Sequence, residues 1–525
     1  KTTEIAALKQ ELSRMMIGDH PEFNRLVDAC VTLDDLFGIR DRLIGSGRIG
    51  GKAAGMLIAR RILLSEKGET NFAEVLEEHD SFYIGSDVFF TFLVNNDLFR
   101  LRLQLSRASA IPHEEFAEVE KRFLAGIFSP TVMEQFRDML AYFGQAPIIA
   151  RSSSLLEDNF GNAFAGKYRS EYCANQGTPE ERLEAFLRAV KLVYASALNP
   201  DAIAYRRARG LGESDEQMAI LVQRVSGTPY KKFFFPSLAG VAFSKNLYAW
   251  TDRIDPARGM IRLVFGLGTR AVNRVGNDYP RMIAVSHPRL RPESGAKIAK
   301  YSQWEVDLID LENNAFTTRP VEDVLVGRDY PHLHLLVSLM KDGQPTDPWT
   351  HRLETTTEEL VLTFNRLLDQ TGFVRVIGEM LERLEKVYGQ PVDTEFTAAV
   401  DSGGRLRINL LQCRPMRLPG AVGPVRLPEG IPADRMIFRS VRVNSSGVTP
   451  PMRYLLYIDP ERYGAIDSPN SSAASRPTRK AAPDSGARML SPEQSANSDA
   501  STVCHFWVVV CQPVTERMRS PSISR

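Results

Sequence analysis

Apolar residues recur at intervals of three and four near the start of the chain, and short continuous apolar runs occupy much of its middle. Residues 1–40 place Ile5, Leu8, Leu12 and Met15 on one side of a helix, because about 3.6 residues make one helical turn. The pattern therefore predicts a helical N-terminal extension.

The helical spacing of apolar residues and the short apolar runs both continue along the chain. Thr178 followed by Glu181 is a capping-box pattern at a helix start, and Gly389-Gln390-Pro391 is a natural helix end. The alternation of helices and strands indicates an α/β or α+β fold. Helices are predicted at residues 53–64, 178–194 and 373–388, and strands at 81–84, 147–150, 217–225, 240–244, 261–265, 393–400 and 405–414.

The last two predicted strands are joined by Asp401-Ser-Gly-Gly404, which is typical of a hairpin. If the loop holds these four residues, Val400 faces Arg405, and the same register places Asp393 opposite Gln412.

Polar side chains share one face of this hairpin, because alternate residues of a strand point the same way. Asp393 and Glu395 lie on one strand, and Gln412 and Arg414 lie on the other. Paired carboxylates with room for substrate oxygens suit Mg²⁺. The alternative is a charge pair across two strands at the rim of a sheet.

The stretch from Ala150 to Gly166 concentrates polar groups beside an apolar run. Arg151 offers a fork of donors that matches phosphate oxygens, and the serines after it could complete an anion cradle. Glu157 and Asp158 alone could form a surface ion-pair cluster, but Phe164-Ala165-Gly166 indicates a loop folded over a ligand. The stretch predicts a polyphosphate site.

A glycine-rich turn, Gly45 to Gly51, precedes Lys52 and a helix. It fits G-x-G-x-x-G but lacks the clean preceding strand of a dinucleotide fold, and Ala53 replaces the Ser or Thr of a phosphate-binding P-loop. Lys52 at a helix N-terminus is disfavoured by the helix dipole unless an anion compensates it. The turn either presents Lys52 to an anion or is merely solvated.

Composition narrows the class of protein. The 525 residues suffice for two or three domains, and the net charge of +1 gives no global attraction to nucleic acid or anionic membrane. No apolar stretch reaches the length of a membrane helix. The 5 cysteines contain no C-x-x-C pair, so a reducing, cytoplasmic setting is expected.

The end of the chain differs from the rest. From residue 466 the sequence is rich in Ser, Pro, Ala and Arg, so it is predicted to be disordered, and the last residues match neither this tail nor the domain. This discontinuity and the start without Met suggest an altered or trimmed reading of a longer protein.

Several segments, taken in order, resemble the nucleotide-binding domain of the phosphoenolpyruvate synthase and pyruvate, phosphate dikinase family, over about residues 42–416. They are Gly50-Gly51-Lys52, Arg151-Ser-Ser, Glu157-Asp158, Phe164-Ala-Gly166, Ala202-Ile-Ala-Tyr205-Arg206, Val222-Gln-Arg224, Gly240-Val-Ala-Phe-Ser244, Gly266-Leu-Gly268, Asp393-Thr-Glu395 and Leu411-Gln-Cys-Arg414-Pro415.

The resemblance implies an α+β ATP-grasp fold that binds ATP and Mg²⁺ between two subdomains. The division it implies is a helical extension (1–40), a first subdomain (41–225), a second subdomain (226–420), a short β-rich extension (421–465) and an aberrant or disordered tail (466–525).

Roles for single residues follow from the same resemblance. Lys52 and Arg151 would hold the ATP phosphates, and Gln223 would lie on the adenine side. Phe164, Ala165 and Gly166 would cover the phosphates, and Asp393 and Glu395 would serve Mg²⁺. Arg151, Gln412 and Arg414 would act on the transferred group, with Gln412 also binding nucleotide.

The implied activity is phosphoryl transfer from ATP, as in the first half-reaction of pyruvate, water dikinase. Thr269 stands where the family has Glu, and Thr394 replaces an apolar Ile. The sequence shows no phosphohistidine motif, so the implied partner is a phosphohistidine domain supplied elsewhere. The alternatives are an ATP-binding regulatory or scaffolding module, and a phosphotransferase acting on a glucan or an antibiotic. The sequence predicts no oligomeric state.

Overall fold

The computed structural model describes residues 2–65, 68–107, 113–157, 166–208, 210–211, 216–273, 275–276, 278–348, 353, 359–416, 457–458 and 487–488. Residues 1–246 and 251–417 form one compact unit, and 247–250 with 418–525 form a second. Within the described part of the second unit, β18 (Tyr457–Ile458) pairs with β19 (Ala487–Arg488). Helices and mostly antiparallel sheets make the first unit an α+β structure.

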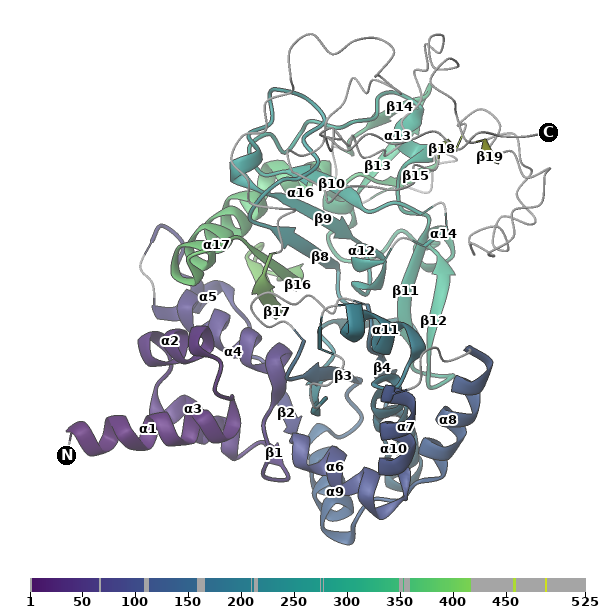
Figure 1. The fold of residues 1–525 in the computed structure, drawn as a ribbon. Coiled ribbons are helices and arrows are strands. Elements are labelled where there is room, and N and C mark those ends of the chain that lie inside the picture. Colours follow the sequence, from purple (N-terminus) through teal and green to yellow (C-terminus); the bar gives the residue numbers. More distant parts are fainter. Residues whose placement is uncertain are drawn as a thin grey trace, which may run out of the picture. The chain divides into compact units, whose positions relative to one another are not determined.

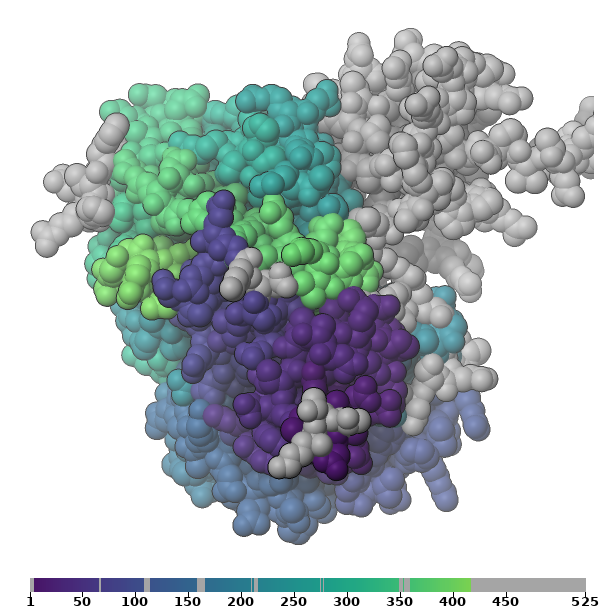
Figure 2. All heavy atoms as spheres, turned by 90° about the vertical axis from the view of Figure 1, so that its left-hand side faces the viewer, coloured from purple at the N-terminus to yellow at the C-terminus, as the bar shows by residue number. Residues whose placement is uncertain are grey.

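The chain begins with three helices, as the apolar spacing predicts (Figure 1). They are α1 (Thr2–Met16), α2 (Pro21–Cys30) and α3 (Leu33–Arg40). Arg25 of α2 donates hydrogen bonds to the carbonyls of Val387 and Tyr388. The N-terminal residues therefore lie against a segment close to residue 388, as purple beside green shows in Figure 2.

The first sheet has five strands in the order β1-β2-β5-β3-β4, with β1 and β2 parallel and the other pairs antiparallel. Its strands are β1 (Leu43–Ile44), β2 (Ser81–Ile84), β3 (Ile148–Ser154), β4 (Ser170–Cys173) and β5 (Met218–Arg224). The helices before and between them are α4 (Gly50–Ser65), α5 (Phe72–Val75), α6 (Ser86–Asn95), α7 (Leu98–Arg107), α8 (His113–Ala125), α9 (Pro130–Phe143), α10 (Pro179–Ser196) and α11 (Pro200–Ala208). The capping box at Thr178 and Glu181 is confirmed at the start of α10.

The second sheet is antiparallel in the order β10-β9-β8-β16-β17. Its strands are β8 (Leu238–Phe243), β9 (Met260–Val264), β10 (Arg281–Ala284), β16 (Val392–Val400) and β17 (Leu406–Pro415). A four-stranded sheet contains β6 (Thr228–Tyr230), β7 (Phe233–Phe235), β11 (Glu305–Asp310) and β12 (Ala315–Pro320), and a three-stranded sheet contains β13 (Val337–Lys341), β14 (Gln344–Thr346) and β15 (Leu360–Leu362). The helices here are α12 (Thr269–Val272), α13 (Lys297–Lys300), α14 (Val321–Val324), α15 (Leu333–Leu336), α16 (Asn365–Gln370) and α17 (Phe373–Tyr388), with a 3₁₀ turn at Pro256–Arg258.

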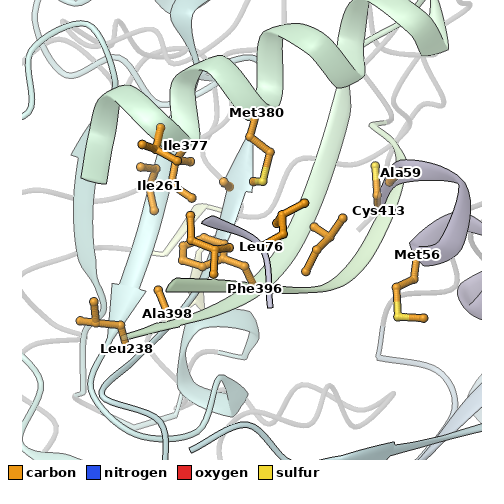
Figure 3. Close-up of a cluster of buried hydrophobic side chains, with 14 of the residues drawn as sticks. Met56, Ala59, Leu76, Leu238, Ile261, Ile377, Met380, Phe396, Ala398 and Cys413 are labelled. Atoms are coloured by element: carbon orange, nitrogen blue, oxygen red, sulfur yellow. The ribbon is translucent and has the colours of Figure 1, made fainter. Parts of the chain in front are cut away.

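Two helices cover one face of the β16–β17 hairpin (Figure 3). Cys413 and Phe396 of the hairpin belong to a buried apolar cluster with Met56 of α4 and Ile377 and Met380 of α17. The other face of the hairpin is thereby left to meet β3 and the segment after β5.

Every strand of the first sheet precedes residue 225, and every strand of the other three sheets in the first unit follows it. The two ATP-grasp subdomains are consistent with this division and stay a prediction. Within the described ranges, no helix is both long and apolar enough to cross a membrane.

Candidate active site

The N-terminus of α4 packs directly against β3. A Cβ atom on Gly50 would lie 1.5 Å from the carbonyl oxygen of Ser153, and one on Gly51 would lie 1.9 Å from that of Glu157. Gly50 also has a positive φ of 81°. The glycine pair is therefore required by the close approach of two backbones, and it fixes the position of Lys52.

Lys52 is buried and paired with a carboxylate of the same chain. Its Nζ lies 3.1 Å from Glu157 Oε1 and 3.4 Å from Ser152 Oγ. Glu157 also accepts hydrogen bonds from Ser152 Oγ and the Ser154 amide. The sequence left open whether Lys52 faces an anion or lies in a solvated turn; in the structure the Glu157 carboxylate is the anion beside it.

Arg151 links the two main sheets. Its Nη1 donates to Gln223 Oε1 at 3.4 Å and to the Leu411 carbonyl at 3.2 Å. Its Nη2 donates to Gln412 Oε1 at 2.9 Å and forms an ion pair with Glu395. One guanidinium on β3 therefore meets β5, β16 and β17.

The segment around Arg151 differs from the expected loop cradle. β3 continues as a strand through Arg151 to Ser154. Ser153 Oγ donates to the Ile49 carbonyl and accepts from the Ala53 amide, and Ser154 Oγ donates to Glu216. The serines therefore hold α4 and the strand in place, because their hydroxyls already have partners within the fold.

The hairpin confirms the shared face but not the predicted register. Val400 pairs with Leu406, so the connection holds five residues, and Asp393 pairs with Arg414. A β-bulge then brings Glu395 opposite Gln412. The prediction assumed a loop of four residues and regular pairing of the two strands. The longer loop and the bulge both shift the pairing, so the predicted register was wrong.

Charges on this face are balanced in pairs. Arg414 Nε lies 2.8 and 3.0 Å from the two carboxylate oxygens of Asp393. Burial alone would raise the pKa of Glu395, but the charges of Arg151, Arg414 and Lys52 outweigh it and lower that pKa below its ordinary value. Glu395 is therefore ionised at neutral pH.

Sequence reasoning missed the continuation of this face. Thr397 pairs with Asn409 directly beyond Glu395 and Gln412, and Asn409 Nδ2 donates to Ser226 Oγ at 2.5 Å. Thr397 could have been predicted, because it follows Glu395 by two residues on the same strand. Asn409 could not, because the bulge interrupts the alternation on the other strand. Both residues belong to the same polar face.

A cavity of about 520 Å³ adjoins the end of this face. Val225, Ser226 and Gly227, which connect β5 to β6, form part of its wall together with Asn409. Its volume lies in the usual range for a small-molecule site. Its other lining residues are Glu77, Glu78, Asp80, Gln145, Ala146, Pro147, Gln176, Arg224, Pro229, Phe234 and Leu311.

Other predicted site residues fall elsewhere. Asp158, Phe164 and Ala165 lie outside the described residues, and Gly166 is exposed with a φ of 68°. Thr269 hydrogen-bonds to Asp307. The next residue, Arg270, forms ion pairs with Asp278, Glu305 and Asp307, so the segment after Gly-Leu-Gly belongs to a separate charged network.

The donor set limits what could hold a metal. In the described part of the chain, no group of three or more His, Cys, Asp and Glu side chains is arranged to bind an ion. Asp393 and Glu395 remain as two carboxylates on one face. They fit Mg²⁺, which typically takes one or two protein carboxylates and completes its shell with water and substrate phosphates.

The predicted site residues outside the covering loop therefore come together: Lys52, Arg151, Gln223, Asp393, Glu395, Gln412 and Arg414 form one connected set of contacts and charges. Three cations and the acids beside them, next to a cavity, suit a ligand that carries several negative charges.

Comparison with known proteins identifies the family to which the chain belongs. Over 308 residues, the chain is 24% identical to the "Uncharacterized phosphotransferase YvkC" of Bacillus subtilis (strain 168). That match takes in 58% of this chain and 29% of the relative, so the chain spans less than a third of that protein. Residues 46–423 match the family of the pyruvate phosphate dikinase AMP/ATP-binding domain, and this range contains every residue of the site. The chain therefore belongs to that family of ATP-binding phosphotransfer domains.

Proposed function

We propose that the chain binds ATP with Mg²⁺ between β3 and the β16–β17 hairpin and transfers a phosphoryl group from it. The convergence of Arg151, Glu395 and Gln412 carries this proposal, because it joins a phosphate-binding fork to a metal-binding carboxylate. Membership of an ATP-binding family supports the nucleotide.

Each side chain has a role in this proposal. Lys52, Arg151 and Arg414 hold the phosphates, while Gln412 orients the transferred group. Asp393 and Glu395 would hold Mg²⁺, which would supply neutralisation of the phosphate charge. Catalysis then rests on positioning and charge neutralisation.

The base and ribose occupy the cavity lined by the segment 225–227. Glu77 and Glu78 line this cavity and could accept hydrogen bonds from ribose hydroxyls. Phe164, Ala165 and Gly166 would cover the phosphates. The reaction corresponds to the first half-reaction of pyruvate, water dikinase, with a histidine of a separate phosphohistidine domain as acceptor.

A second function is an ATP-sensing module that binds ATP without turnover. It is favoured by Thr269, which stands where the family has a glutamate. The Thr269 hydroxyl donates a hydrogen bond to Asp307. The two functions share the site and differ only in whether a phosphoryl group of the bound ATP is transferred.

The test measures ATP affinity by calorimetry for the wild type, Arg151→Lys and Arg151→Ala. Loss of charged hydrogen bonds worth about 1.5–3 kcal/mol should weaken binding roughly 10- to 100-fold in Arg151→Ala. Arg319 is exposed on β12, so Arg319→Ala is the matched control and should bind as the wild type does.

Radiolabelled Mg·ATP then separates the functions. Label on AMP, on phosphate or on an added phosphohistidine domain supports transfer. Binding with no labelled product supports the sensing module. Absence of ATP binding, or equal affinity in the wild type and Arg151→Ala, would overturn the site.

A further inference from the structure

A buried glutamate lies behind the turn that follows β3. The carboxylate of Glu216 accepts hydrogen bonds from the hydroxyls of Ser154 and Tyr168. Arg206 of α11 supplies its counter-charge, with Nη1 at 3.4 Å from Glu216 Oε2. The side chains of Arg206 and Glu216 are 6% and 4% exposed, so this ion pair is shielded from water. Three donors therefore fix the carboxylate in one place.

This network has no role in the proposed function so far. Arg206 ends the segment Ala202–Arg206, one of those that carry the family resemblance. Its guanidinium also donates to the Tyr168 hydroxyl and to the Ala197 carbonyl, each at 2.9 Å. A buried polar network that is fully bonded is rigid, and this one converges on Glu216.

Ser154 connects Glu216 to the turn. Its hydroxyl donates to Glu216 and accepts from the Leu156 amide at 3.0 Å. A hydroxyl has a single hydrogen, so its donation to Glu216 leaves only its lone pairs for the turn. The Ser154 carbonyl accepts from the Glu157 amide at 3.0 Å, and the Ser154 amide donates to Glu157 Oε2. Glu216 thus holds the hydroxyl that closes the turn.

Glu157 carries the effect of the turn to Lys52. Its Oε1 lies 3.1 Å from Lys52 Nζ, so a continuous chain of contacts runs from Glu216 through Ser154 and Glu157 to this ammonium group. A lysine has a long, flexible stem, and ordering such a side chain costs free energy when a ligand binds. An ammonium group that is already held in place loses less freedom when it meets phosphate.

We infer that Glu216 and Ser154 are positioning residues for ATP binding. Both are buried, and they act by fixing the turn that carries Glu157 and, through it, the ammonium group of Lys52. The inference rests on the proposed function, in which Lys52 holds phosphate. Breaking the chain of contacts at Ser154 should weaken ATP binding through Lys52 alone.

The experiment measures the dissociation constant of ATP with Mg²⁺ by calorimetry, for the full chain and its variants. Ser154→Ala removes the hydroxyl and keeps the Glu216–Arg206 ion pair; it should weaken ATP binding about tenfold, as loss of a hydrogen bond to a charged group does. Glu216→Asp keeps the charge beside Arg206 but draws the carboxylate back from Ser154, and it should weaken binding similarly. The double variant should bind no worse than Ser154→Ala, because both changes break the same chain of contacts.

Tyr168→Phe is the matched control. It removes a hydrogen bond from the same carboxylate without altering the turn, so its ATP affinity should stay within about twofold of the wild type. Circular dichroism melts establish that each variant folds. If Ser154→Ala does not fold, Glu216→Asp carries the test.

A second background distinguishes positioning from general loosening of the fold. Lys52→Met combined with Glu157→Gln removes both charges of the buried pair together, so neither is left without a partner. In this background Ser154→Ala should change the dissociation constant of ATP by less than about twofold, because no ammonium group remains to be positioned.

The outcomes separate the two proposals. Wild-type affinity in folded Ser154→Ala would overturn the positioning role and leave the proposed function intact. Equal weakening in Tyr168→Phe, or a tenfold effect that persists without Lys52, would do the same. If the wild type binds no ATP, the proposed function fails, and the positioning role fails with it.

Discussion

Lys52 is a buried ammonium group whose counter-charge comes from its own chain. Its side chain is 7% exposed and that of its partner Glu157 is 5% exposed. A buried charge without a partner is strongly unfavourable, so the ligand-free protein needs Glu157 in this position. When a nucleotide binds, phosphate oxygens can take over part of that role.

Glu157→Gln should therefore destabilise the ligand-free protein by about 3 kcal/mol, because removing one member of a buried pair leaves the other charge unpaired. Urea unfolding measures the loss. Glu118→Gln is the matched control, since Glu118 pairs with Lys121 on the surface, and its effect should stay within about 0.5 kcal/mol. Equal stability of Glu157→Gln and the wild type would contradict the pairing.

Residue types revealed the site only in part. Lys52, Arg151, Asp393, Glu395, Gln412 and Arg414 were predictable because each lies in a short pattern whose chemistry suits phosphate or metal. The partnership of Lys52 with Glu157 was not predictable, since it joins residues 105 apart through the packing of a helix on a strand. Asn409 was hidden for a similar reason: its bond to Ser226 spans 183 residues.

At the scale of elements, apolar periodicity located α4, α10 and α17, but α6 to α9 and α11 were not predicted. The boundaries of α17 agree with the predicted 373–388, and α10 begins at its predicted cap. β3 was predicted too short, as 147–150, because Arg151 and the three serines after it are polar. They continue as strand since tertiary partners satisfy every one of them, and no local pattern carries that information.

The junction of α4 with β3 gives a prediction at this scale. Gly51→Ala would set a Cβ atom 1.9 Å from the carbonyl oxygen of Glu157, so α4 and the turn that follows β3 must separate. We expect a loss of about 3 kcal/mol in the free energy of unfolding, the upper end for overpacking. The measurement is urea unfolding of the ligand-free chain.

Gly38→Ala is the control for that substitution. Gly38 is exposed in α3, and a Cβ atom there would meet nothing within 4 Å. Alanine in an exposed helix should stabilise the protein by about 0.5–1 kcal/mol. The close approach of α4 to β3 would be refuted if both glycine variants were equally stable.

At the scale of the whole first unit, the site is neutral because its cations and carboxylates pair with one another. Lys52 pairs with Glu157, Arg151 with Glu395, and Arg414 with Asp393. ATP alone would take the cations and leave buried carboxylates without counter-charges. Mg²⁺ alone would take Asp393 and Glu395 and remove the carboxylate counter-charges of Arg151 and Arg414.

Nucleotide and metal should therefore bind with positive coupling, for which 5- to 150-fold is the usual range. We expect chelation of Mg²⁺ with EDTA at pH 7 to raise the dissociation constant of ATP about 30-fold. At that pH Glu395 is ionised, because its pKa lies below the ordinary value. Glu395→Gln removes one carboxylate that needs the metal. In this variant, chelation of Mg²⁺ should raise the dissociation constant of ATP by less than about threefold. Glu322→Gln, at an exposed position of α14, should keep the wild-type effect of Mg²⁺ on ATP affinity.

Calorimetric titration of each protein with ATP, with and without Mg²⁺, measures this effect. A large effect of Mg²⁺ that persists in Glu395→Gln would show that the metal is held by other groups.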